Sequence, residues 1–208
     1  MKICVIAPHC DDETLGCGGM LLKFKKLKIP ISVIIVTEIK DNSMDKILNQ
    51  IKKKYKLNNL YRLKYSPSKL DLQDKDELIQ RIKSYLVSIK ASDVFIPNES
   101  DIHSDHGIVH RASLAASKWY RNNYTKKILV YETLSETEIF SKDSFTPNYF
   151  IDITDHIEDK CNIMKIYKKE IKKFPFPRSK DSIISLAKFR GTSCGYKFAE
   201  SFKIIFSK

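Results

Sequence analysis

Short runs of apolar, β-branched residues alternate along the chain with longer stretches in which apolar residues recur every three or four positions. The apolar runs predict strands at residues 3–7, 31–37, 60–65, 93–97, 128–131 and 149–153. The periodic stretches predict helices at about 14–28, 43–56, 75–90, 107–122 and 155–172. Near-continuous apolar strands that alternate with helices are typical of a mostly parallel sheet with helices on both faces, so the expected fold class is α/β with three layers.

The chain contains 208 residues, and no linker, internal repeat or low-complexity segment interrupts this alternation, so a single domain over residues 1–208 is expected. No apolar run approaches the ~18 residues that a membrane-spanning helix needs. The apolar start of the chain ends at Asp11-Asp12-Glu13, which predicts a buried strand rather than an export signal. Five cysteines without a CxxC pair favour free thiols in a reducing compartment, and we therefore expect a cytoplasmic protein.

A formal net charge of +12, from 37 basic and 25 acidic residues, raises the alternative of a nucleic-acid-binding protein. Its best candidates are two basic segments with aromatic residues, Lys52-Lys53-Lys54-Tyr55 and Lys118-Trp119-Tyr120-Arg121. However, only six of the 37 basic residues are arginine, the preferred reader of phosphates and bases, and the lysines are spread over most predicted helices. We expect no nucleic-acid partner, and the charge instead favours an anionic small-molecule substrate.

The segment Pro8-His9-Cys10-Asp11-Asp12-Glu13 directly follows the first predicted strand and begins a helix. In a mostly parallel sheet, the loops that follow the strands form the site. His9 and Asp12 are three positions apart across a tight turn and can converge on one cation, and imidazole and carboxylate are suitable zinc ligands. Asp11 lies between them and remains available as a base. The alternative is that Asp11 or Asp12 only caps the helix, whose N-terminal dipole favours anions.

A second polar segment, Asp101-Ile102-His103-Ser104-Asp105-His106, follows the fourth predicted strand and is therefore expected at the same edge of the sheet. His106 is a candidate third metal ligand, since two histidines and one carboxylate with a position for water form a catalytic zinc site. His103, oriented by Asp105, which would raise its pKa, suits an imidazolium that stabilises negative charge. An alternative pairs His106 with His110 one helical turn later, but we favour a surface or supporting position for His110.

The segments Ala7-Pro8-His9-Cys10-Asp11-Asp12-Glu13 and His103-Ser104-Asp105-His106 together resemble the two signature motifs of the PIG-L (LmbE-like) family. The similarity extends over nearly the whole chain and follows the pattern of the branch with bacillithiol and mycothiol pathway deacetylases. The resemblance implies a Rossmann-like α/β fold and a zinc-dependent N-deacetylase that acts on N-acetylglucosamine-containing substrates. The further similar segments are residues 148–155 with Lys160, Arg178-Ser179, Arg190-Gly191 and Ala199-Glu200-Ser201-Phe202.

Carried over position by position, the resemblance also implies roles for single residues. It implies Asp11 as the general base and His103, paired with Asp105, as the group that stabilises the transition state. The leaving amine then receives its proton from Asp11 or from His103. The metal, zinc or another divalent ion such as Fe²⁺, is implied to have three protein ligands: His9, Asp12 and His106.

Two departures from the family pattern concern the rim of the site. Cys10 stands where the family usually has proline, which removes some rigidity and places a thiol near the metal. After the second strand the family often has Thr-x-Gly-Glu followed by an arginine, whereas this chain has Thr37-Glu38-Ile39-Lys40-Asp41 and no arginine before Arg62. We expect hydrolysis of an acetamido sugar, and a member that binds sugar without hydrolysing it is the alternative. The sequence leaves the oligomeric state open, a homo-oligomer included.

Overall fold

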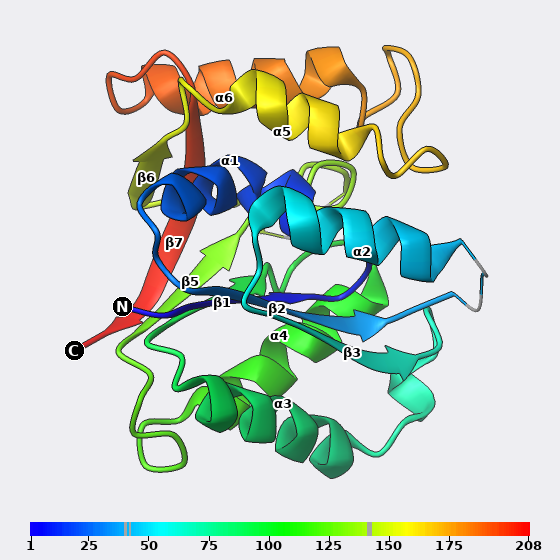
Figure 1. Ribbon diagram of the computed structural model, residues 1–208, viewed down its shortest axis with the longest axis vertical. Coiled ribbons are helices and arrows are strands. Elements are labelled where there is room, and N and C mark those ends of the chain that lie inside the picture. The colour runs from blue at the N-terminus through cyan, green and yellow to red at the C-terminus, as the bar shows by residue number, and fades with distance from the viewer. Residues whose placement is uncertain (40, 42, 141–142) are drawn as a thin grey trace.

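The computed structural model describes residues 1–39, 41, 43–140 and 143–208, and strands in this part of the chain form one sheet (Figure 1). The strands are β1 (Ile3–Ala7), β2 (Ile31–Thr37), β3 (Asn59–Tyr65), β4 (Asp93–Pro97), β5 (Lys127–Tyr131), β6 (Tyr149–Asp152) and β7 (Ala199–Ser207). Their order across the sheet is β3-β2-β1-β4-β5-β7-β6. Strands β1 to β5 are parallel, whereas β7 is antiparallel to both of its neighbours. The expected α/β fold with a mostly parallel sheet is confirmed.

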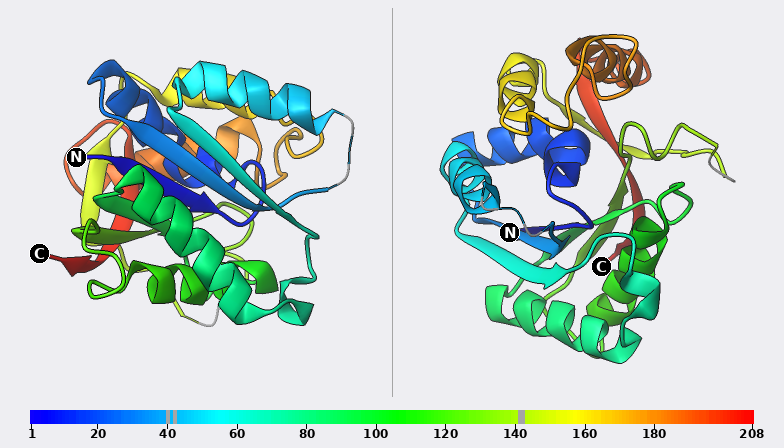
Figure 2. Two further views of the ribbon diagram at one scale, coloured as in Figure 1. Left: turned by 60° about the horizontal axis from the view of Figure 1, so that its bottom comes forward. Right: turned by 90° about the vertical axis from the view of Figure 1, so that its right-hand side faces the viewer.

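Helices cover both faces of the sheet and give the molecule three layers (Figures 1 and 2). The helices are α1 (Asp12–Lys26), α2 (Met44–Tyr55), α3 (Lys75–Ile89), α4 (Ser104–Ser117), α5 (Ile157–Met164) and α6 (Lys180–Thr192), with a short 3₁₀ helix at Leu70–Leu72. One face carries α3 and α4, and the other carries α1 and α2 with α5 and α6. None of the helices built from the described residues is both long and apolar enough to cross a membrane.

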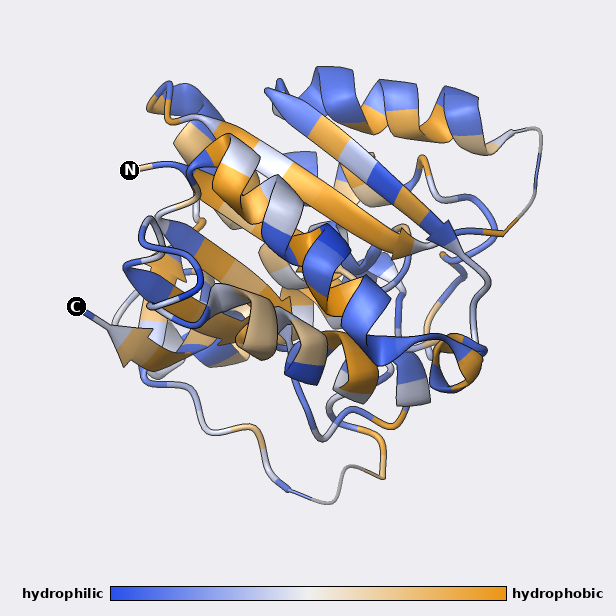
Figure 3. Cartoon of the chain, turned by 90° about the horizontal axis from the view of Figure 1, so that it is seen from below, coloured by the Kyte–Doolittle hydropathy of each residue, from blue (hydrophilic) through white to orange (hydrophobic). Residues whose placement is uncertain are grey.

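The burial of each element follows its apolar pattern. Every residue of β1 and β2 is buried, because helices cover both faces of these central strands. Helix α2 buries Leu48, Ile51 and Tyr55 on one side and exposes Lys52 to Lys54 on the other, as an amphipathic surface helix does. In Figure 3 the central strands are mostly coloured as hydrophobic, while the covering helices carry both colours.

Four elements differ most from the expectations. Helix α4 begins at Ser104 instead of 107, because the His103 side chain accepts the backbone N–H of Asp105 and so caps the first turn. The helix expected over 155–172 ends at Met164, and turns occupy the residues that follow. Helix α6 and strand β7 were not expected from the alternation of patterns, although β7 lies between β5 and β6 in the sheet.

Candidate active site

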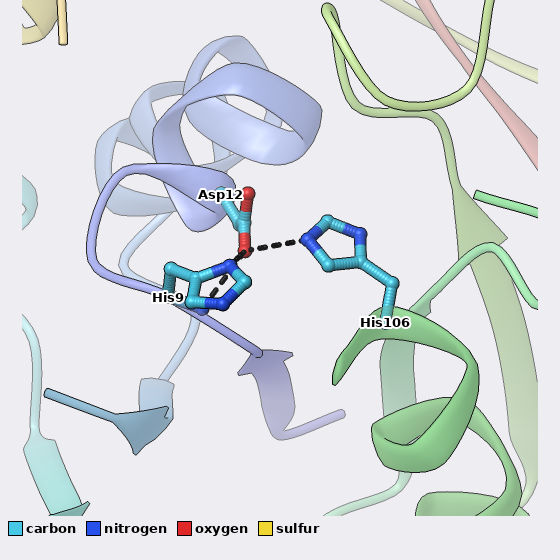
Figure 4. A group of neighbouring side chains, drawn as sticks. All are labelled: His9, Asp12 and His106. Carbon is cyan, nitrogen blue, oxygen red and sulfur yellow. Dashed lines mark hydrogen bonds and ion pairs between the residues drawn. The ribbon is translucent and has the colours of Figure 1, made fainter. Parts of the chain in front are cut away.

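The two predicted polar segments lie side by side at the carboxyl edge of the sheet. β1 and β4 are adjacent parallel strands, so the loop after β1 and the loop after β4 meet although about ninety residues separate them. His9 comes from the first loop and Asp12 from the first residue of α1, while His106 belongs to the first turn of α4. Figure 4 shows these three side chains pointing toward one another.

One carboxylate oxygen lies at the centre of this group. Asp12 Oδ2 is 3.3 Å from His9 Nδ1 and 3.3 Å from His106 Nε2. Asp12 and His106 are buried, and His9 is partly exposed. Two ligand atoms that each lie about 2.1 Å from a tetrahedral ion are themselves about 3.4 Å apart. The spacing of these three side chains therefore matches that of ligands around one small cation.

The other nitrogen of each imidazole is held by a second carboxylate. His106 Nδ1 donates to Asp101 Oδ2 at 2.7 Å, and His9 Nε2 donates to Asp105 Oδ2 at 3.1 Å. These bonds turn the lone pairs of His9 Nδ1 and His106 Nε2 toward Asp12, and the buried His106 Nε2 has no hydrogen-bond partner. Lone pairs that face a carboxylate oxygen repel it unless a proton or a metal ion lies between them. The donor set thus fits a divalent cation with imidazole and carboxylate ligands.

The pKa values of these groups show how strongly the site attracts positive charge. Burial would lower the pKa of His106, but the carboxylates of Asp12 and Asp101 raise it to about 10. Burial opposes protonation of His9 in the same way, and the hydrogen bonds with Asp105 and Asp12 raise its pKa to about 9. Burial would raise the pKa of Asp12, but His106 and His9 hold it below its ordinary value. In the absence of a metal, protons occupy the positions that an ion would take.

Asp11 and the three converging side chains line one cavity, and Arg178 holds the Asp11 side chain. Arg178 Nη1 donates to Asp11 Oδ2 at 2.9 Å and to Glu170 Oε2 at 2.8 Å. Burial, and then the charge of Asp12, raises the pKa of Asp11 well above its ordinary value, while Arg178 opposes this rise. The Asp11 side chain makes no capping bond to α1, and Asp12 Oδ2 accepts the N–H of His9. The capping alternative therefore does not describe how these carboxylates are used.

The backbone of Asp11 has a conformation that side chains rarely adopt, with φ 116°. Glu13 stabilises it, because Glu13 Oε2 accepts the N–H of Asp11 at 3.0 Å. Glu13 Oε1 accepts the hydroxyls of Thr14 and Tyr167, both at 2.6 Å. Glu13 is fully buried, and its carboxylate thus ties the turn that presents Asp11 to the segment after α5. The predicted helix over residues 155–172 includes Tyr167, but the sequence pattern did not indicate its contact with Glu13.

His103 and Asp105 are less closely paired than expected. Asp105 Oδ2 is 4.0 Å from His103 Nδ1, but it accepts hydrogen bonds from His9 Nε2 and, at 2.7 Å, from the N–H of Ser68. Burial and then the neighbouring His9 lower the pKa of His103, whereas the sequence analysis expected Asp105 to raise it. Because His103 Nδ1 accepts the N–H of Asp105, a neutral His103 carries its proton on Nε2.

His110 is buried rather than at the surface. Its Nδ1 donates to the carbonyl oxygen of Pro97 at 2.8 Å, and its Nε2 lies 3.8 Å from Glu99. Among the described residues His110 is not part of any group of converging metal-ligand atoms. It supports the loop after β4, which carries Asp101 and His103, and the alternative that pairs it with His106 as ligands is not favoured.

The site opens into a cavity of about 560 Å³. Apolar side chains of Ile39, Met44, Ile47 and Ile166 form part of its wall. The described lining residues also include six carboxylates and four lysine or arginine side chains: Asp11, Asp12, Glu38, Asp41, Glu136 and Glu170, and Lys46, Lys168, Lys169 and Arg178. The positive charge of the molecule is therefore not concentrated in this cavity.

The loop after β2 is held by an arginine from a different strand. Glu38 lines the cavity and accepts two hydrogen bonds from Arg62 of β3, which also contacts Asp45 at the start of α2. Thr37 donates through its hydroxyl to the carbonyl of Pro8 at 2.8 Å. Lys40, part of the run on which the departure from the family pattern was based, lies outside the described residues. An arginine of the neighbouring strand thus holds this loop through Glu38.

Cys10 lies at the cavity wall, but its thiol is not a good metal ligand. Burial, and then the charges of Glu13 and Asp11, raises its pKa above the ordinary value, which disfavours the thiolate. Cys10 is absent from the converging ligand groups of the described residues.

Residues from the later segments that resemble the family, after residue 148, hold the elements that carry the site. Glu200 accepts the N–H groups of Gly19 and Met20 in α1, both at 2.7 Å, and Lys160 Nζ donates to Glu200 and to the carbonyl of Leu15. This buried ion pair therefore bonds the middle of the helix whose first residue is Asp12. In the same region, Arg190 pairs with Glu132 at the end of β5.

Comparisons with known proteins agree with this arrangement. Residues 4–117 match the model of the PIG-L family, described as GlcNAc-PI de-N-acetylase. The conserved protein TT1542 from Thermus thermophilus has a TM-score of 0.83 at 20% identity, over 100% of this chain and 96% of that one. N,N'-diacetylchitobiose deacetylase from Pyrococcus horikoshii, complexed with its inhibitor MPG, has a TM-score of 0.79 at 19% identity, over 98% and 83%. GalB, the 4-carboxy-2-hydroxymuconate hydratase from Pseudomonas putida KT2440, has a TM-score of 0.74 at 13% identity, over 100% and 98%.

These solved structures share the fold at low identity, and their names include both a deacetylase and a hydratase. The fold by itself therefore does not determine the reaction. The family match is more informative about descent, because it covers more than half of the 208 residues and includes both segments that form the site. On that match, this chain is a member of the PIG-L family.

Proposed function

We propose that this protein is a metal-dependent N-deacetylase that hydrolyses the acetamido group of an N-acetylglucosamine-type sugar. The observation that carries the proposal is the convergence of His9, Asp12 and His106, whose lone pairs face one another beside the carboxylate of Asp11. The family match and the deacetylase among the structural relatives support the same reaction class. The likeness to the bacillithiol and mycothiol branch stays a prediction.

His9, Asp12 and His106 would hold the metal, with zinc or Fe²⁺ as ions that suit this ligand set. Bound there, a divalent ion supplies Lewis-acid chemistry, because it polarises an acyl carbonyl and makes water more acidic. Asp101 and Asp105 keep the two imidazoles turned toward the ion through the hydrogen bonds at Nδ1 of His106 and Nε2 of His9.

Asp11 is the proposed general base. Its carboxylate lies in the cavity next to Asp12, and Arg178 fixes one of its oxygens at 2.9 Å. It accepts a proton from the water that attacks the acetamido carbonyl carbon. The Asp11 carboxylic acid then returns this proton to the sugar nitrogen as the C–N bond breaks, and acetate and the free amine leave.

His103 is the proposed donor to the oxyanion that develops on the carbonyl oxygen. Because its Nδ1 accepts the N–H of Asp105, its Nε2–H is available to donate into the cavity that it lines. A neutral imidazole is sufficient for this role, so the imidazolium expected from the sequence is not required. This leaves Asp11 as the group that protonates the leaving amine.

The cavity also bears on the class of substrate. Its volume of about 560 Å³ lies within the range of pockets that enclose drug-sized ligands, so we propose a sugar conjugate rather than a free monosaccharide. Because carboxylates outnumber lysine and arginine side chains among its described lining residues, we do not carry forward the expectation of an anionic substrate.

The test measures acetate released from a panel of N-acetylglucosaminides by the zinc-loaded protein, together with the zinc content of each variant. Asp11→Asn should lower kcat by about 10²–10⁴-fold and retain zinc, because only the base is removed. His106→Ala should lose zinc as well as activity. His156→Ala, a histidine remote from the site in the chain and absent from the converging ligand groups, is the matched control and should change neither.

The outcomes separate the alternatives. Sugar binding without release of acetate from any conjugate would support a non-hydrolysing member and overturn the proposed reaction. Full activity of Asp11→Asn would overturn the assignment of the base, and unchanged zinc content in His106→Ala would overturn the assignment of the ligand.

A further inference from the structure

The loop between α4 and β5, residues 118–126, exposes large aromatic side chains and buries polar ones, which is the reverse of their usual distribution in proteins. Trp119, Tyr120 and Tyr124 have 61%, 59% and 40% of their surface exposed, whereas Asn122 and Thr125 are 1% and 0% exposed. Large aromatic side chains normally lie in the interior, because burying them removes 150–250 Å² of mostly apolar surface from water. A loop that exposes three of them while burying two polar residues indicates a surface that contacts something other than water.

The buried polar residues explain how this loop keeps its shape. Asn122 Nδ2 donates to the hydroxyl of Thr125 at 2.9 Å, and Asn122 Oδ1 accepts the N–H of Tyr124 at 3.1 Å. The N–H of Asn122 also donates to the carbonyl of Lys118, and that of Lys126 to the carbonyl of Ser92. The hydrogen bonds of the loop are thus made internally and to the neighbouring segment. The aromatic side chains are not needed to hold it.

Cations accompany the exposed rings. Lys118 lies 6.0 Å from the centre of the Tyr120 ring, and Lys90 from the end of α3 lies 5.7 Å from that of Tyr124. Trp119 and Tyr120 meet edge to face, with 5.6 Å between ring centres. Residues 117–126 contain no acidic side chain. We call the following set the α4–β5 patch: Lys90, Lys118, Trp119, Tyr120, Arg121 and Tyr124.

This combination fits the interface of an anionic lipid bilayer. Tryptophan and tyrosine prefer the boundary between acyl chains and headgroups, because one part of each ring system is apolar and the other can hydrogen bond. Lysine and arginine beside them attract anionic headgroups, by about fivefold in affinity per cation, and their side chains extend toward the polar phase.

Single-stranded nucleic acid is the competing partner, and the ring geometry disfavours it. Bases bind by stacking on open aromatic faces along a groove. Here lysines approach the rings of Tyr120 and Tyr124, and Trp119 meets Tyr120 edge to face instead of parallel. The second basic segment of the sequence, residues 52–55, has a fully buried Tyr55 and therefore offers no exposed ring at all.

We propose that the α4–β5 patch is a peripheral binding site for membranes that contain anionic phospholipid. The patch precedes the amino end of β5, whereas the candidate active site follows the carboxyl ends of β1 and β4. Because these strands are parallel, membrane contact through the patch leaves the mouth of the active-site cavity facing the aqueous phase. The net charge of +12 adds a long-range attraction toward the same surface.

Trp119 is the single tryptophan of the chain, so its fluorescence reports on the patch directly. The experiment adds vesicles of phosphatidylcholine, with or without phosphatidylglycerol, to the protein and records the emission of Trp119 and co-sedimentation. We expect a blue shift and sedimentation only with phosphatidylglycerol. Lys90→Gln, Lys118→Gln and Arg121→Gln combined should weaken partitioning by about 100-fold, because three cations of the patch are lost. Trp119→Ser with Tyr120→Ser should also abolish sedimentation.

The matched control removes the same charge elsewhere. Lys52→Gln, Lys53→Gln and Lys54→Gln combined change three exposed lysines of α2 and should retain most of the binding. An equal loss in this control would show that only overall charge matters and would overturn the proposal. No blue shift with anionic vesicles, or tighter binding of oligothymidylate with quenched emission, would overturn it as well. Unchanged thermal unfolding of the patch variants excludes misfolding as the cause of any loss.

Discussion

At the scale of single residues, the orientation of His9 and His106 depends on which ring nitrogen of each is hydrogen-bonded to a second carboxylate. Asp101 holds Nδ1 of His106 and Asp105 holds Nε2 of His9, so the remaining nitrogens face Asp12. The spacing of residues in sequence indicated His9, Asp12 and His106 as a group. It could not indicate which carboxylate orients which ring, because that depends on how two loops meet.

Glu13 offers a test of how the Asp11 turn is maintained. In Glu13→Gln one carboxylate oxygen becomes an NH₂ group, which would face either the N–H of Asp11 or the hydroxyls of Thr14 and Tyr167, and all of these are donors. We expect a loss of about 1–3 kcal/mol in unfolding free energy, and a lower kcat at unchanged zinc content, because Asp11 would no longer be presented correctly.

Urea unfolding, zinc analysis and acetate release measure these effects. Tyr167→Phe removes one donor and should show a smaller change in the same direction, whereas Tyr196→Phe, at an exposed position, should show none. Wild-type kcat in Glu13→Gln would contradict a positioning role for this carboxylate.

At the scale of elements, helix α1 lies unusually close to the sheet and to the segment after β6, and its glycines permit this. A Cβ atom at Gly16 would lie 2.3 Å from Tyr131 Cδ2 and 3.0 Å from the carbonyl oxygen of Glu132. A Cβ atom at Gly107 in α4 would come no closer than 3.1 Å to the carbonyl oxygen of Glu99. The two positions therefore form a matched pair of helical glycines with different surroundings.

We expect Gly16→Ala to lower the unfolding free energy by about 1–3 kcal/mol, because α1 must move away from β5. Gly107→Ala should be close to neutral, since the gain in helix propensity of about 1 kcal/mol offsets a mild contact. Urea midpoints measure both variants. If Gly16→Ala were as stable as the wild-type protein, the close packing of α1 against β5 would not be required for the fold.

The elements also show which parts of the fold the sequence could predict. The expected bounds of three strands, 3–7, 31–37 and 93–97, are those of β1, β2 and β4, because continuous apolar runs between polar loops mark buried parallel strands clearly. In strand β7, apolar and polar residues follow neither a continuous apolar run nor a regular alternation. The helix before it, α6, has only a weak apolar face, so the hydrophobic pattern did not reveal either element. Arg178 lies in an aperiodic segment, and only the family resemblance drew attention to it.

At the scale of the whole molecule, the site links stability to metal and to pH. The pKa values of His9 and His106, about 9 and about 10 in the folded protein, lie above the ordinary value near 6.5. A raised pKa stabilises the folded state fully below the unfolded pKa, and this stabilisation is lost as pH rises through the folded pKa. Zinc would replace these protons and make their loss irrelevant.

We therefore expect the Tm of the metal-free protein to fall between pH 7 and pH 10 more steeply than that of the zinc-loaded protein. The increase in Tm caused by zinc should grow with pH over this interval. Differential scanning calorimetry with and without a chelator measures the difference. His106→Ala should show no increase with zinc at either pH, and a zinc effect that persisted in this variant would place the metal elsewhere.

The hydrogen bonds between Glu200 and the backbone of Gly19 and Met20 have a consequence for biosynthesis. The ribosome makes α1 early and Glu200 about 180 residues later, so the helix that begins with Asp12 lacks this support while most of the chain is being translated. Because β7 lies between β5 and β6, the sheet is completed only after residues 199–207 have been made. We therefore expect metal to be acquired late in synthesis, only after Glu200 has been made and has bonded to α1.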